Sequence, residues 1–170
     1  MPAGKTYTQI SSQTLTSNTG TINIGSFSGY TDLRIVLTYF VAGNGGSNIT
    51  VNSSTSGYGE MDLYGNPLVY TIYYGGSRGD IYFYGNYEHN STTVPGSFIL
   101  DIPYYARTDT NHMLFYTRGT TAGGSGATSY ETSVGMAQWN NTSAITSLQL
   151  SHTGLFATGT TVSVYGITEA

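Results

Sequence analysis

Side chains able to act as acids, bases or nucleophiles are scarce in this chain. Its 170 residues include nine Asp or Glu, five Lys or Arg, three His and no Cys. Glu60 and Asp62 stand two residues apart, so a strand would place both carboxylates on one face. Paired carboxylates perform glycoside hydrolysis. Nothing else in the sequence specifies such a pair, so we expect Glu60 and Asp62 to lie on a solvated strand face.

The three histidines, His89, His112 and His152, lack the spacing of zinc ligands and have no cysteine beside them. The sequence also lacks a Gly-x-Ser-x-Gly elbow, a phosphate-binding loop, a dinucleotide fingerprint and a calcium loop. We therefore predict no catalytic, metal-binding or cofactor-binding residues, and a protein that is not an enzyme.

Arg78-Gly79-Asp80 has the sequence of the integrin-recognition tripeptide. Three residues make a weak signal, because Gly and Asp are common in turns. We predict that residues 75–79 form the turn of a β-hairpin whose strands are residues 68–74 and 80–84.

Tyrosines gather in this predicted hairpin, and the whole chain has 16 of them. On an exposed sheet face, a tyrosine ring can stack on a sugar or anchor a protein partner. Inside the sheet, the same rings would pack across strands, and both interpretations stay open. The possible partner-contact residues are Tyr70, Tyr73, Tyr74, Arg78, Tyr82, Tyr84 and Tyr87.

Short segments of strand-forming residues recur along the chain, and none keeps the apolar spacing of a helix. Residues 32–41 are apolar on nearly both faces, so this strand should be central. Residues 119–129 form a predicted flexible loop of Gly, Thr and Ser. The pattern predicts an all-β fold, an antiparallel β-sandwich or jelly roll with essentially no helix. Its expected strands are residues 9–15, 21–24, 32–41, 49–53, 60–64, 68–74, 80–84, 97–103, 112–118, 133–139, 147–151 and 161–165.

Charged residues make up only 8% of the chain, against about 25% in an ordinary soluble domain. The net charge of −4 and the scattered basic residues argue against nucleic-acid binding. We expect no membrane span and no secretory signal. A surface of hydroxyls, amides and tyrosines repels little, so it is either an assembly surface or an ordinary bland one. We predict a flexible N-terminal arm, residues 1–8, and one β-sandwich domain, residues 9–170.

Both ends of the chain resemble a small β-domain encoded among the virion structural genes of tailed bacteriophages. The N-terminal part is "ISSQTLTSNTGTINIGSFSGYTDLRIVLTYF", residues 10–40. The stronger part is "AQWNNTSAITSLQLSHTGLFATGTTVSVYGI", residues 137–167, and "FILDIPYYA", residues 98–106, is loosely similar. Residues 49–88 depart from the pattern. The resemblance implies a tight strand end at Gly166 and core positions at Trp139, Ile145, Leu148, Leu150 and Phe156.

The resemblance implies a place in the virion. We expect that place to be the outer capsid surface, with the tail as the alternative. We expect a capsid decoration or cement protein that binds the major capsid protein and copies of itself, as a homotrimer. Residues 1–8 would then add a strand to a neighbour's sheet edge. One alternative is a tail fibre or baseplate component that binds host glycans. A second is a polysaccharide depolymerase, which the missing acid pair and the small size disfavour.

Overall fold

The computed structural model describes residues 7–66, 69–82, 91–121 and 130–168, with the side chains of 64–66, 69–77, 91, 120–121 and 130–131 left out. All regular structure in these residues is β-strand, which confirms the predicted all-β class. No helical segment among them has the length and apolar character needed to cross a bilayer. The strands are β1 (Tyr7–Thr14), β2 (Thr19–Gly25), β3 (Asp32–Val41), β4 (Ser47–Val51), β5 (Tyr58–Asn66), β6 (Val69–Arg78), β7 (Ile81–Tyr82), β8 (Ser91–Ile102), β9 (His112–Thr121), β10 (Tyr130–Trp139), β11 (Ser147–Phe156) and β12 (Thr161–Ile167).

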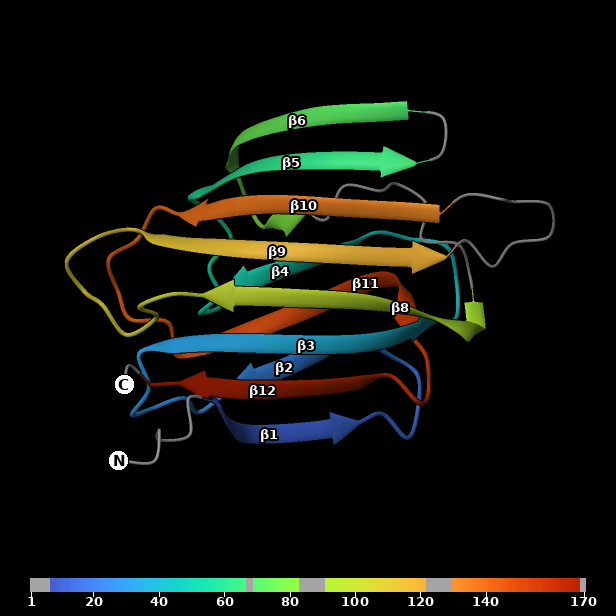
Figure 1. Ribbon diagram of the computed structural model, residues 1–170, viewed down its shortest axis with the longest axis horizontal. Coiled ribbons are helices and arrows are strands. Elements are labelled where there is room, and N and C mark those ends of the chain that lie inside the picture. The colour runs from blue at the N-terminus through green and yellow to red at the C-terminus, as the bar shows by residue number, and fades with distance from the viewer. Residues whose placement is uncertain (1–6, 67–68, 83–90, 122–129, 169–170) are drawn as a thin grey trace, which may run out of the picture.

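The strands form two antiparallel layers, as a β-sandwich requires (Figure 1). The larger layer has the order β6-β5-β10-β9-β8-β3-β12-β1, and the smaller layer has the order β2-β11-β4-β7. The layers are joined at one corner, where Phe156 of β11 pairs with Val41 of β3. The sandwich is therefore one continuous sheet folded over its own core.

Strand β3 is an interior strand of the larger layer, paired on both sides with β12 and β8, as its apolar sequence predicts. Leu33, Ile35 and Leu37 point into the core, and the residues between them lie half-exposed on the outer face. The residues that the virion resemblance marks as core, Trp139, Ile145, Leu148, Leu150 and Phe156, are all buried.

Tyrosine rings lie directly over strand glycines in this fold. Tyr39 covers Gly96, Tyr116 covers Gly135, and Tyr30 covers Gly166, in each case so closely that a Cβ atom on the glycine would collide with the ring. A glycine paired with a large aromatic side chain lets the ring lie flat across the neighbouring strand. This pairing gives the Gly-rich and Tyr-rich composition a structural purpose.

Gly135→Ala should therefore destabilise the fold strongly, by about 2–4 kcal/mol, because the new methyl group displaces the Tyr116 ring and its hydrogen bond. Gly20→Ala is the matched control, since a Cβ atom there meets its nearest neighbour, Leu155, at an ordinary 3.6 Å. Urea unfolding of both variants measures the difference. Equal stabilities for the two variants would contradict the proposed ring-over-glycine packing.

The predicted hairpin of residues 68–74 and 80–84 is wrong. Residues 75–78 continue β6, which pairs with β5, whereas β7 pairs with β4 in the smaller layer. The reason is that β6 already has a partner in β5, so the chain crosses from one layer to the other at Gly79 and Asp80. The hairpin is the β5–β6 pair instead.

The predicted arm and loop also differ from the structure. Tyr7 and Thr8, expected in the N-terminal arm, belong to β1 and pair with Ile167 and Gly166 of β12. Residues 1–6 lie outside the described residues. Strand β9 runs on to Thr121, so residues 119–121 of the predicted loop are strand, and residues 122–129 lie outside the described residues.

Candidate functional site: an apolar sheet face over a buried polar cluster

The outer face of β5, β10 and β9 is apolar and exposed. Leu63 and Met61 of β5 lie opposite Val134 and Met136 of β10, and Met136 lies opposite Phe115 of β9. The exposed fractions are 54% for Leu63, 58% for Val134 and 45% for Phe115. Large apolar side chains gathered in this way on a sheet face mark a contact surface.

Methionine is concentrated on this face. Three of the chain's four methionines, Met61, Met113 and Met136, line its two shallow hollows of about 290 and 340 Å³. Methionine is flexible and polarisable, so it adapts to the shape of a partner. We call the surface formed by Met61, Leu63, Met113, Phe115, Val134 and Met136 the apolar face.

On the outer side of the sheet, the charged group that borders the apolar face at Phe115 is already paired with another charge. Asp101 lies opposite Phe115, and its carboxylate accepts two hydrogen bonds from Arg34, with Nε at 2.6 Å and Nη2 at 2.8 Å. The apolar face itself is built from uncharged side chains. A protein partner could therefore cover it without stripping water from a charge.

Glu60 and Asp62 lie on the opposite side of β5, inside the sandwich. Both are buried, so the predicted solvated strand face is wrong. The alternation along β5 explains the error, because Met61 and Leu63 occupy the solvent-facing positions and turn the two carboxylates inward. In the sequence, a stretch that alternates acidic and apolar residues would normally be oriented the other way.

Glu60 connects four strands. Its Oε1 accepts a hydrogen bond from the Tyr116 hydroxyl of β9 at 3.0 Å, and its Oε2 accepts one from the backbone N–H of Tyr82 in β7 at 3.1 Å. Arg78 of β6 lies 3.8 Å from the same Oε2. Burial raises the pKa of Glu60 to about 7, although these hydrogen bonds and the Arg78 charge oppose the shift.

Asp62 lies two residues after Glu60 in β5 and is completely buried. Neither of its carboxylate oxygens accepts a well-formed hydrogen bond from the described residues. Burial raises the pKa of Asp62 to about 6, and the Arg118 charge and the Tyr116 hydroxyl partly offset this effect. Burial also raises the pKa of the Tyr116 hydroxyl, and the charges of Glu60 and Asp62 raise it further. Tyr116 therefore stays protonated and donates a hydrogen bond.

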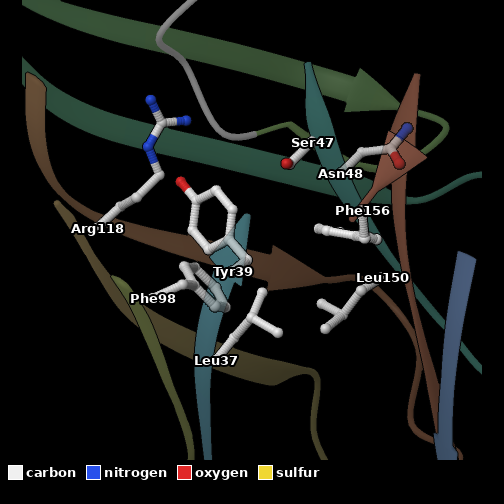
Figure 2. A pocket seen from close by; sticks show the side chains of 8 residues that line it. All are labelled: Leu37, Tyr39, Ser47, Asn48, Phe98, Arg118, Leu150 and Phe156. Carbon is white, nitrogen blue, oxygen red and sulfur yellow. The ribbon is translucent and has the colours of Figure 1, made fainter. Parts of the chain in front are cut away.

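A small cavity lies between the two layers beside this polar cluster (Figure 2). Figure 2 shows Arg118 and the Tyr39 ring on one side of it and Leu150 and Phe156 on the other. Its volume of about 10 Å³ is room for about one water molecule. The cavity is too small for a substrate.

Two of the predicted partner-contact residues are described, and both hold the structure together. Arg78 lies over the Tyr82 ring, 5.3 Å from its centroid, and beside Glu60. The side chains of Tyr70, Tyr73 and Tyr74 lie outside the described residues, as do residues Tyr84 and Tyr87. Within Arg78-Gly79-Asp80, Asp80 also has a structural partner, because it accepts a hydrogen bond from Asn48 at 2.6 Å.

Two histidines are buried and make contacts that stabilise the fold. His112 stacks on Trp139 and its Nε2 lies 2.9 Å from the Ser143 carbonyl oxygen, while Nδ1 of His152 accepts a hydrogen bond from the Gly154 N–H. His89 lies outside the described residues. In the described ranges, no three His, Asp or Glu side chains gather closely enough to hold a metal ion.

Comparison with family models, with curated proteins and with solved structures gives no match for this chain.

Sequence reasoning missed the apolar face. A signal was present, since Met113, Phe115, Val134 and Met136 occupy alternate positions in two segments correctly predicted as strands. The other face of each strand is also apolar, with Leu114 and Tyr116 in β9 and Ala137 and Trp139 in β10. Such a strand is expected to be buried on both sides. In the described residues no second layer covers the outer side of these strands, and this exposure makes the apolar face a candidate site.

Proposed function

We propose that this protein is a structural protein of a tailed-phage virion that decorates the assembled capsid and stabilises it. The observation that carries the proposal is the apolar face, an uncharged contact surface on the outside of the larger layer. The resemblance of residues 10–40 and 137–167 to virion β-domains supports the location. A ligand that binds only the intact shell stabilises that shell by mass action.

The small size of the apolar face limits the binding energy that one copy can supply, so it favours a partner that binds several copies together. Burying one large apolar side chain fully contributes about 1.5–3 kcal/mol, and the four most exposed members of the face are only about half-exposed. Their combined contribution of about 4 kcal/mol does not exceed the cost of association, about 4–15 kcal/mol. One copy of the face therefore binds weakly.

Self-association would overcome this weakness. A homotrimer carries three apolar faces, and a capsid shell presents its subunits in a regular array, so several faces engage together. Linked binding events strengthen the overall attachment by about 10²–10⁴. This is how we propose that a weak face gives stable decoration of the assembled shell while the free capsid subunit is bound poorly.

Two further features support an architectural role. The 8% of charged residues leaves the surface with little repulsion toward a neighbouring protein. The acidic pair Glu60 and Asp62 lies inside the sandwich, with Asp62 completely buried, so a polysaccharide could not reach it without separating the two layers. Their arrangement favours packing over hydrolysis.

Sedimentation with virion parts tests the proposal. Purified protein is mixed with capsids that lack it, with isolated tails and with unassembled capsid subunits. We expect the protein to pellet with the capsids. We expect no pelleting with the isolated tails and none with the unassembled capsid subunits. Pelleting with tails alone would replace the proposal with a tail fibre or baseplate role.

A further inference from the structure

A second surface site lies at the loop between β8 and β9, beside the apolar face, with which its hollow shares Met113. A hollow of about 220 Å³ is formed there by Pro103, Tyr104, Arg107, Thr110, Asn111 and neighbouring residues. It is smaller than the roughly 300–1,000 Å³ of sites for drug-sized molecules. Its ligand must be correspondingly small.

Tyr104 presents an aromatic ring at this hollow and does so in an unfavourable backbone conformation. Its side chain is 48% exposed, and its φ of +49° lies in the left-handed region. An aromatic residue in that region is a conformational outlier, which persists only where the surroundings hold it and which is concentrated at binding sites. The backbone N–H of Tyr104 donates to Asp32 at 2.9 Å, and the Tyr104 carbonyl oxygen accepts from the Arg107 N–H at 3.0 Å.

The neighbouring residue makes the loop rigid. Tyr105 is buried and packs edge-on against Phe27 with ring centroids 6.0 Å apart, and its carbonyl oxygen accepts a hydrogen bond from Ile145 at 2.8 Å. With Tyr105 fixed in the core, the positive φ of Tyr104 holds its ring at the surface. A rigidly held ring binds at a small entropic cost.

The polar groups around the ring include both donors and acceptors. Arg107 lies over the Tyr104 ring, 5.5 Å from its centroid, and its Nε and Nη2 donate to Asp109 at 2.8 and 2.9 Å. Asn111 donates to Asn140 at 3.2 Å and contributes an amide to the hollow. Because Asp109 already neutralises Arg107, the site does not favour an anion. A small ligand with many hydroxyl groups and an apolar face matches it best.

We propose that Tyr104, Arg107 and Asn111 form a binding site for one neutral pyranose ring of a glycan. The apolar side of the sugar lies on the Tyr104 ring, and its hydroxyls bond to the Arg107 guanidinium and the Asn111 amide. Tyr104, Arg107 and Asn111 are not members of the apolar face, although Met113 lines the hollows of both surfaces. Decoration and sugar binding are therefore tested by different substitutions.

Titration of methyl pyranosides of glucose, galactose, mannose and N-acetylglucosamine into ¹⁵N-labelled protein tests the site. We expect at least one to give saturable shifts of the amides of Tyr104, Arg107 and Asn111, with a dissociation constant of about 1–10 mM, as a ligand this small allows. No saturable shift with any of the four would overturn the proposal.

Two substitutions make the test specific. Tyr104→Ala should remove the saturable shifts, while Tyr7→Ala should keep them. Tyr7 is the matched control, because it is equally exposed and also lies beneath an arginine, Arg34, at 5.6 Å. Sugar shifts that survive Tyr104→Ala would overturn the assignment of the ring.

Tyr104→Gly separates binding from stability. Glycine adopts a positive φ without strain, so this variant should lose the sugar shifts and gain about 2–4 °C in Tm. A lower Tm for Tyr104→Gly would show that the tyrosine is kept for stability and would overturn the proposal.

Discussion

Replacing Phe115 and Val134 together by lysine should reduce binding to assembled capsids at least a hundredfold. Both side chains are about half-exposed at the centre of the apolar face, on the adjacent strands β9 and β10. Each lysine removes an apolar contact and places a charge that must be desolvated on binding. In the proposed homotrimer three faces would bind together, so the small loss at each face would be multiplied in the overall affinity.

The double variant should fold normally, since exposed positions change the free energy of unfolding by less than about 1 kcal/mol. Thr38→Lys is the matched control, because Thr38 is exposed on the same outer side of the larger layer but lies on β3, outside the apolar face. Pelleting with capsids, with Tm measured in parallel, checks the result. Normal capsid binding by a folded Phe115→Lys, Val134→Lys protein would exclude the apolar face as the contact surface.

The protein should be more stable at pH 5 than at pH 8, the reverse of ordinary acid sensitivity. Burial raises the pKa of Glu60 from 4.5 to about 7, and that of Asp62 from 3.8 to about 6. A group whose pKa is raised by folding stabilises the native state fully below its unfolded pKa. That contribution is lost as the pH rises through the folded pKa. The loss therefore falls between about pH 4 and pH 7.

Glu60 alone should account for about 3 kcal/mol of this change, because its carboxyl group titrates near 7 in the folded chain and near 4.5 in the unfolded chain. Glu60→Gln should flatten the pH dependence and exceed the wild type in stability at pH 8. Asp109→Asn, at an exposed carboxylate, is the control and should leave the dependence in place. Urea unfolding from pH 4.5 to 8.5 gives the answer, and a wild-type stability that rises with pH would refute it.

The class of fold was predictable because period-two alternation and turn residues recur along the chain. The interior position of β3, with a paired strand on each side, followed from its two apolar faces. The pairing of strands that are distant in the sequence was harder to predict. Nothing local in residues 68–84 shows that β6 pairs backward with β5 while β7 joins the other layer.

The site was harder to predict than the fold, because burial inverted the expected roles on β5. Met61 and Leu63 face solvent while Glu60 and Asp62 face the core, so charge and hydrophobicity point the opposite way from the usual rule. The inversion depends on Gly135, which lets Tyr116 cross β10 and reach Glu60. A three-strand arrangement of this kind involves residues far apart in the sequence, so no single segment reveals it.

The copy number of this chain in purified virions is the most direct test of capsid decoration. Quantitative mass spectrometry measures it against the major capsid protein and the tail proteins in the same sample. Decoration predicts a fixed ratio to the capsid subunits across the whole shell. A copy number equal to that of a tail protein, or absence from the particle, would contradict decoration of the capsid.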